Sequence, residues 1–219
     1  MTYKELISKI DNHENFSFSR WGDGEINCIL GAEGGQNQLQ NCDNHKYYKA
    51  LGMELYKVIM SKPKYVMGLQ GLAKSQREDD PYFKELTSGI DWVASDIIHH
   101  ASIKNGLDDL FDVLSNRSVI LIGNFHLAAL SFKYKFNYAH IVIGENDCWL
   151  EYEDIKKRLA SYIENNDVVL YCASMMTEVL INDMYDLWGD QITQIDIGSA
   201  FDPYVSRCTR SYHKKIIEK

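Results

Sequence analysis

One arginine, two carboxylates and two glycines fall close together near the N-terminus. Asp23 and Glu25 are two residues apart, and carboxylates with this spacing on a turn can point at one hard divalent cation, which takes oxygen ligands. Arg20 suits a phosphate group, because its planar guanidinium matches two phosphate oxygens. Gly22 and Gly24 permit backbone angles and close approaches that a Cβ would forbid. These residue types predict a site for Mn²⁺ or Mg²⁺ next to a phosphorylated ligand.

The same residues also have a purely structural interpretation. Alternation at Phe16 and Phe18 predicts a strand before the turn, and the apolar run 26–30 predicts a helix after it. Asp-Gly is a common turn dipeptide, and Asp23 can simply cap that helix. From the spacing alone, both interpretations stay open.

The stretch Arg20-Trp-Gly-Asp-Gly-Glu25 resembles the Arg-aromatic-Gly-Asp-Gly-Glu signature of the GT-D type glycosyltransferases. Trp21 stands where that family is expected to carry Phe or Tyr. Two weaker similarities are the stretch 145–155, which contains Asn146, and the strand that ends in Asp196-Ile-Gly198. The resemblance implies a Rossmann-like fold. It also implies an Asp-X-Glu element that serves a divalent metal and the diphosphate of a nucleotide sugar.

Composition sets limits on the fold class and the partners. The 219 residues are enough for one sizeable domain, which we place at 1–219. The formal net charge of −8 disfavours a nucleic-acid partner, which would need a basic surface. The five cysteines form no Cys-x-x-Cys pair, which disfavours zinc and a disulfide framework. No apolar run approaches ~18 residues, and the N-terminus lacks a signal-peptide core, so we expect a cytoplasmic protein without a transmembrane segment.

Segments of strand and helix character alternate along the chain. Strands are predicted at 16–19, 65–70, 117–123, 140–144, 167–172 and 194–198. Helices are predicted at 2–13, 46–61, 81–88, 90–103, 107–115, 124–132, 151–164 and 173–187. The polar stretch 32–45 and the charged stretch 74–81 are predicted to be exposed connections. The alternation predicts an α/β fold, a single Rossmann-like domain with a mostly parallel sheet of about six strands flanked by helices.

Ligands of open α/β sheets bind beyond the carboxyl ends of the strands. Small or polar residues follow several predicted strands, at 20–25, 68–71, 123–124, 144–146, 172–174 and 196–202. Gly123-Asn124 and Ser174 each lead into a helix, whose free amides can hold a phosphate, although Asn124 and Ser174 can also be plain caps. Neither turn has a G-x-G-x-x-G or P-loop pattern, which disfavours NAD enzymes and P-loop NTPases. His99 and His100 end a predicted helix and are expected on the surface.

The polar, aromatic tail after the last predicted strand concentrates charged groups. If it folds back over the strand ends, Arg207 and Arg210 can neutralise a diphosphate. Asp202 or His213 could then serve as the base that deprotonates an acceptor hydroxyl. His126, just past the Gly-Asn turn, is a further candidate for ligand contact. The alternative is a solvated tail without a role in the site.

These features together predict metal-dependent transfer of a sugar from a nucleotide diphosphate donor, expected to be a UDP-sugar, to a hydroxyl acceptor, expected to be a glycan. Two alternatives stay open. One is a metal-dependent phosphoesterase or nuclease that uses the same carboxylates. The other is a non-catalytic nucleotide-binding protein in which Asp23-Gly24 is only a turn. The chain is short, so the acceptor site can depend on the stretch 32–45, on the tail or on a second subunit of a homo-oligomer.

Overall fold

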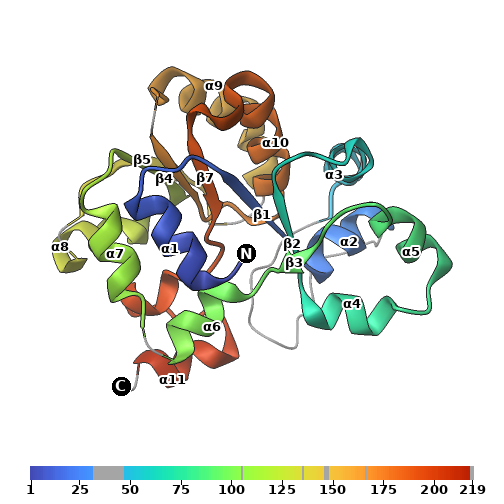
Figure 1. Cartoon of the computed structure of the whole chain (residues 1–219), viewed down its shortest axis with the longest axis horizontal. Helices are drawn as coiled ribbons and strands as arrows, with labels where there is room; N and C mark the ends of the chain where they lie inside the picture. The colour runs from blue at the N-terminus through green and yellow to red at the C-terminus, as the bar shows by residue number, and fades with distance from the viewer. Residues whose placement is uncertain (32–46, 105, 135, 146–147, 166, 218–219) are drawn as a thin grey trace.

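A computed structural model of the protein (Figure 1) describes residues 1–31, 47–104, 106–134, 136–145, 148–165 and 167–217. Within these residues one sheet of seven parallel strands has the order β3-β2-β1-β7-β6-β4-β5. The strands are β1 (Ser17–Trp21), β2 (Val66–Leu69), β3 (Val93–Ala94), β4 (Val119–Asn124), β5 (Ala139–Ile143), β6 (Val168–Tyr171) and β7 (Thr193–Asp196). The predicted α/β class is confirmed, with one strand more than expected.

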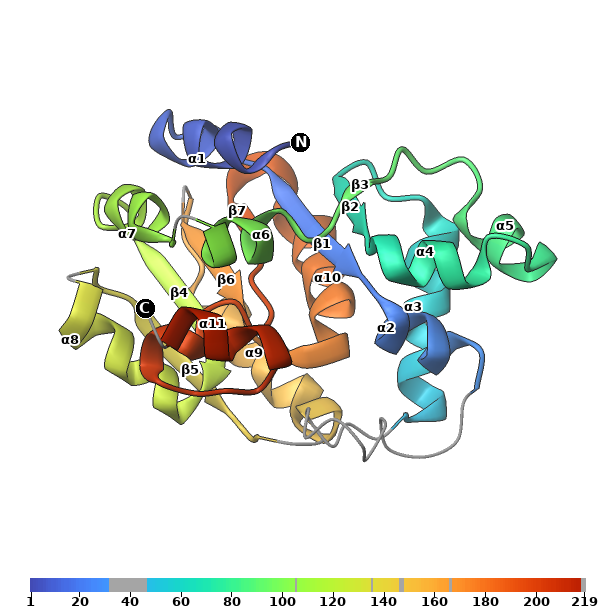
Figure 2. The ribbon, with the colours of Figure 1, turned by 90° about the horizontal axis from the view of Figure 1, so that it is seen from below.

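Helices cover both faces of the sheet. They are α1 (Tyr3–Asp11), α2 (Asp23–Ile29), α3 (Lys49–Ser61), α4 (Gly71–Arg77), α5 (Pro81–Thr87), α6 (Ile97–Lys104), α7 (Asp108–Leu114), α8 (Leu130–Tyr134), α9 (Tyr152–Tyr162), α10 (Thr177–Trp188) and α11 (Lys214–Ile217). One core lies under α2, α3, α9 and α10, and a second lies under α1, α6 and α7 (Figures 1 and 2). The central strands β6 and β7 are buried along their whole length. β6 is a continuous apolar run, as is typical of a parallel sheet, whereas β7 buries Thr193, Gln194 and Asp196.

The segment between β2 and α6 differs in part from the prediction. Residues 74–81 are largely exposed, as predicted, but residues 74–77 belong to α4, whose Lys, Gln and Arg residues are good helix formers. The predicted helix 90–103 begins only at Ile97, because Val93–Ala94 pair with β2 and form the edge strand β3. A two-residue strand is too short to show a period of two, so the helical spacing of the neighbouring apolar residues concealed it. The stretch 32–45 lies outside the described residues.

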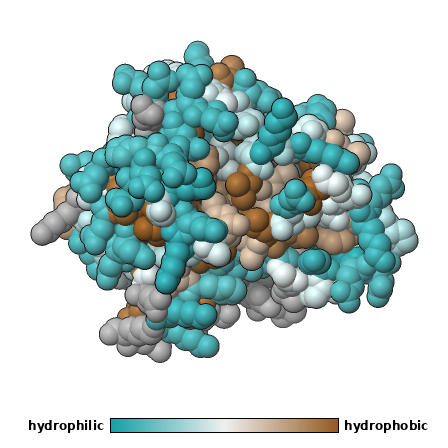
Figure 3. Space-filling model, in the orientation of Figure 1, coloured by the Kyte–Doolittle hydropathy of each residue, from teal (hydrophilic) through white to brown (hydrophobic). Residues whose placement is uncertain are grey.

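The tail returns to the sheet. After β7 the chain passes through two short 3-10 helices, η6 (Asp202–Val205) and η7 (Ser211–His213), and α11 packs beside α6 (Figure 2). The face seen in Figure 3 is mainly hydrophilic, with apolar residues gathered near its centre around β2 and β3. Among the described residues, no helix has both the length and the apolar composition that a membrane crossing needs.

Candidate functional site

A cavity of about 440 Å³ opens beyond the carboxyl ends of the strands. Most of the residues predicted for the site line it: Arg20, Gly22, Asp23, Gly24, Glu25, Asn124, Ser174, Asp202, Arg207 and Arg210. His126 lines it as well. The structure therefore brings together groups that come from both ends of the chain. Asn146 lies outside the described residues, and Gly123 and His213 are not part of the lining.

The acidic turn joins β1 to α2. Trp21 is buried at the end of the strand and donates from its indole Nε1 to Ser19 Oγ at 3.1 Å. Gly22 is the N-cap of α2, and its N–H donates to Glu25 Oε2 at 2.7 Å. This is the reach-back half of a capping box, so Glu25 has a structural task. The predicted cap by Asp23 is wrong, because Gly22 is the N-cap. Asp23, the first residue of α2, is exposed at the cavity.

The surroundings of Glu25 favour the protonated form of its carboxyl group. Burial raises the pKa of its carboxyl to about 7, and the charges of Asp196 and Asp23 add to this rise. The hydrogen bond from the Gly22 amide opposes the rise without cancelling it. Glu25 is therefore divided between its neutral and ionised forms near neutral pH, and a cation bound beside it would displace the proton.

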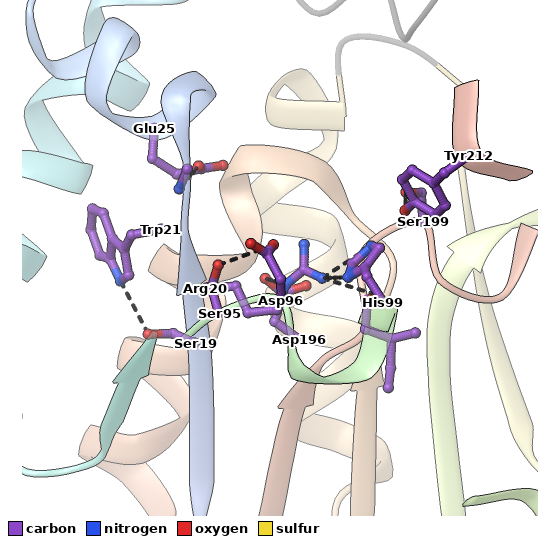
Figure 4. Close-up of polar contacts among 12 residues, drawn as sticks. Ser19, Arg20, Trp21, Glu25, Ser95, Asp96, His99, Asp196, Ser199 and Tyr212 are labelled. Carbon is purple, nitrogen blue, oxygen red and sulfur yellow. Dashed lines mark hydrogen bonds and ion pairs between the residues drawn. The ribbon is translucent and has the colours of Figure 1, made fainter. Parts of the chain in front are cut away.

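Arg20 is held by a buried network at the centre of the cavity wall (Figure 4). Its Nε donates to Asp196 Oδ2 at 3.2 Å, and its Nη1 donates to His99 Nδ1 at 2.6 Å and to the Ile197 carbonyl oxygen at 3.4 Å. Burial and the Arg20 charge lower the pKa of His99 well below its usual value. His99 is therefore neutral and can accept from the arginine.

Besides Glu25 and Asp196, a third carboxyl group is buried near this network. Glu178, in the first turn of α10, is 1% exposed, and its pKa is raised well above its ordinary value by burial and by the charges of Glu25 and Asp196. Burial also raises the pKa of Asp196, although Arg20 opposes the rise. Asp196 thus pairs directly with Arg20, and burial disfavours the charged form of Glu178 beside them, which limits the excess of negative charge.

Gly198 makes room for the guanidinium. Its φ is +56°, and a Cβ at this position would lie 2.6 Å from Arg20 Nη2. Both the left-handed conformation and the close approach require glycine. The Asp196-Ile-Gly198 segment therefore supplies the carboxylate that pairs with Arg20 and the space in which Arg20 lies.

A second charged group lines the cavity where the tail meets the end of β5. Arg207 Nη1, from the tail, donates to Glu145 Oε1 at 2.8 Å and to His126 Nδ1 at 2.6 Å. Burial and the Arg207 charge lower the pKa of His126 to about 4, so the ring is neutral and can accept. Asn124 caps η2 (Phe125–Ala129) by accepting from the His126 amide at 3.5 Å. The tail folds back against the cavity instead of extending into solvent.

Other predicted residues have mainly local partners. The Asp202 carboxylate accepts from Thr209 Oγ1, and the Asp202 carbonyl accepts from the Arg207 amide at 2.9 Å. His213 is fully buried, and its Nδ1 accepts from the Thr209 amide at 3.2 Å. A Cβ at Gly123 would lie 2.5 Å from Leu127 Cδ1, so this glycine allows β4 to pack against η2.

Ser174 leads from β6 into η4 (Ser174–Met176) and α10 with a φ of +58°, an uncommon conformation for serine. Arg210 completes the set of basic side chains at the cavity. The structure therefore places two arginines of the tail and a helix-leading turn around the space in front of Asp23 and Glu25.

Gln70 belongs to the predicted strand end 68–71, whereas Asp96, His99 and Tyr212 of the lining were not predicted. His99 was expected on the surface but is buried, whereas His100 is exposed. Asp96 and His99 were missed because the predicted helix 90–103 concealed the end of β3. A strand end in that segment would have been the signal, since it would have added a seventh carboxyl end to the predicted site.

Asp23 and Glu25 fit a divalent ion as a pair of carboxylates. The described residues contain no group of three or more His, Cys, Asp or Glu side chains placed to hold a metal by themselves. Mg²⁺ sites commonly use one or two carboxylates and take their remaining ligands from substrate phosphates and water. The donor set therefore suits an ion that binds together with a phosphorylated ligand.

Comparison with known proteins gives a match in structure only. No protein-family model and no curated protein sequence matches the chain. Two solved structures of the domain of unknown function 1792, one of them the selenomethionine-substituted form, superpose with a TM-score of 0.67 at 14% sequence identity. In both cases the match covers 96% of this chain and 82% of the other. That domain is described as having a distinct glycosyltransferase fold, and the present chain shares this fold.

Proposed function

We propose that the protein is a metal-dependent glycosyltransferase that moves a sugar from a nucleotide diphosphate donor, a UDP-sugar, to a hydroxyl group of a glycan. The observation that carries the proposal is the meeting of the Asp23–Glu25 turn with Arg207 and Arg210 at one cavity. Two carboxylates beside two arginine side chains suit a metal-bound diphosphate. The shared fold supports the reaction class.

Each group has a task in such a reaction. A divalent ion would neutralise the charge that develops on the diphosphate as the glycosidic bond breaks. Asp23 and Glu25 would hold that ion, and Arg207 and Arg210 would bind the phosphate oxygens. Arg20 is occupied by Asp196 and His99, so its charge acts on the cavity from a fixed position. The remaining task of the chain is to orient the acceptor hydroxyl against the sugar.

Nucleotide binding without catalysis is the second candidate. The hydrogen bond between the Gly22 amide and Glu25 Oε2 favours it, because this bond already gives Glu25 a structural reason to be present. A carboxylate has further lone pairs, however, so the cap leaves Glu25 able to bind a cation. A two-metal phosphoesterase is less well supported, because the described residues contain no cluster of three or more ligands.

The test is the thermal stability of the protein with UDP, with Mn²⁺ and with both. A ligand that binds only the folded state raises the melting temperature by mass action. We expect a shift that needs UDP and Mn²⁺ together and that is lost in Asp23→Ala and Glu25→Ala. A shift without metal, unchanged in both variants, would favour the non-catalytic candidate.

Glu5→Ala is the matched control. Glu5 Oε2 accepts from the Thr2 amide at 2.6 Å in the capping box of α1, so this variant loses the same kind of cap as Glu25→Ala. Glu5 is exposed and does not line the cavity. We expect Glu5→Ala to keep the full joint shift. Release of UDP from UDP-sugars by the wild type, and its loss in Asp23→Ala, would then establish the transfer chemistry.

A further inference from the structure

Two side chains predicted as the base are already engaged. His213 is fully buried and is not part of the cavity lining. Asp202 lines the cavity, but its carboxylate accepts from Thr209 and its carbonyl from Arg207, so it ties the tail together. The transfer proposed above still needs a group that takes the proton of the acceptor hydroxyl.

Asp96 lines the cavity, and its carboxylate has few hydrogen-bond partners. It lies between β3 and α6 and is half-buried. Ser95 Oγ donates to its Oδ1 at 3.4 Å, a long and weak contact, and no other side chain among the described residues is seen to hydrogen-bond to this carboxylate. Its second oxygen is therefore open to a ligand in the cavity.

The backbone around Asp96 is fixed from two sides. The Ser95 amide donates to the Leu69 carbonyl at 3.4 Å, and a Cβ at Gly68 would lie 2.8 Å from Ser95 Cα. The end of β3 thus lies directly against β2. On the other side the His100 amide donates to the Asp96 carbonyl at 2.8 Å and begins α6. A base held on such rigid elements keeps its geometry when the substrate binds.

Asp96 also lies next to the Arg20 network. His99 follows it by three residues on the same helical face and bonds to Arg20. In Figure 4 the Asp96 carboxylate lies beside the Arg20 guanidinium, and its charge contributes to the raised pKa of Arg20.

We propose that Asp96 is the general base of the transfer; this rests on the proposed function. Asp96 takes the proton of the acceptor hydroxyl while that oxygen bonds to the anomeric carbon. The bond between this carbon and the diphosphate oxygen breaks, and its electron pair leaves with the nucleoside diphosphate. Direct attack by a deprotonated acceptor is a single displacement, so the product has the inverted anomeric configuration.

The experiment measures UDP release from a panel of UDP-sugars with Mn²⁺, with water as the acceptor, for wild type, Asp96→Asn and Asp96→Ala. We expect both variants to lose at least 100-fold in rate and to keep the joint shift of melting temperature with UDP and Mn²⁺. Azide needs no deprotonation, so it should restore UDP release in Asp96→Ala at least tenfold and give an inverted glycosyl azide. Asp108→Asn, the same change in the exposed first turn of α7, should behave as wild type.

The outcomes separate the two proposals. UDP release by Asp96→Asn within threefold of wild type would overturn the assignment of Asp96 and leave the glycosyltransferase intact. Loss of both UDP release and the joint shift, without rescue by azide, would make Asp96 a structural residue. A wild type that releases no UDP from any donor overturns the proposed function and the base together.

Discussion

Two arginines that line one cavity are held in different ways. Arg20 and its partner Asp196 are 18% and 7% exposed, and His99 adds a second contact. Arg207 and its partner Glu145 are 36% and 49% exposed. The first pair is shielded from water by the protein, whereas water competes with the second pair at the rim.

This difference in exposure indicates that the two ion pairs have different roles, one in the structure of the site and one in ligand binding. Removing one member of a buried pair leaves a charge without compensation, so Arg20 is required for the arrangement of the β1 and β7 ends. An exposed pair contributes little to stability, so Arg207 can exchange Glu145 for a phosphate at small cost. Arg20 sets the geometry of the cavity, and Arg207 is available to the ligand.

The largest expected effect comes from Arg20→Met. It leaves Asp196 buried beside Glu178 with no cation, and loss of one partner of a buried pair costs about 3–5 kcal/mol. We expect a fall of this size in the free energy of unfolding, measured by urea denaturation. Arg207→Met is the matched control and should change it by less than about 1 kcal/mol. Equal losses in the two variants would contradict the comparison.

The second prediction concerns how the free energy of unfolding depends on pH through the buried carboxyl group of Glu25. The pKa of Glu25 is raised from 4.5 to about 7 in the folded protein, so the folded state holds the proton more tightly than the unfolded state. The proton on Glu25 therefore contributes to the free energy of unfolding, by about 3 kcal/mol at most. This contribution is full below pH 4.5, falls as the pH rises and is lost above about pH 7. Glu25→Gln cannot ionise and lacks this fall.

The measurement is urea unfolding of wild type and Glu25→Gln at several pH values between 4.5 and 8. The difference in stability should shift in favour of Glu25→Gln as the pH rises. Mn²⁺ with UDP should reverse this trend in the wild type, because the bound cation favours ionised Glu25. A constant difference across the range would contradict the raised pKa of Glu25. Glu5→Gln, at an exposed cap, keeps Glu25 and should show the same pH dependence as the wild type.

The parts of the fold that were predicted correctly have strong local signals. β4 and β6 are continuous apolar runs, and the turn at Gly22–Glu25 combines glycines with charged residues. Periodicity over several residues reports burial directly, so the α/β class followed from it. β3 was missed because two residues are too few for a period to develop, and Asp96 was missed with it.

The side-chain network of the site could not be predicted in the same way. Arg20 and Asp196 are separated by 176 positions, and their pairing depends on β1 lying next to β7 in the sheet. Strand order is a long-range property that local patterns do not contain. His99 was expected on the surface for the same reason, since its burial depends on contacts with Arg20 and Tyr212, which lie far from it in the sequence.

The smallest effect on stability, and the sharpest test of the rim, is Glu145→Gln. It removes the carboxylate that holds Arg207 but keeps the shape of the side chain, and we expect little change in the free energy of unfolding, because the pair is exposed. Arg207 no longer has to leave an ion pair before it reaches a phosphate. Titration calorimetry with UDP and Mn²⁺ should therefore show that Glu145→Gln binds UDP more tightly than the wild type. Arg207→Met should bind UDP about tenfold more weakly than the wild type. Both differences should shrink as salt is added, because the rim is exposed. If Glu145→Gln weakens binding as Arg207→Met does, the ion pair itself shapes the rim, and the division of tasks between the two arginines is wrong.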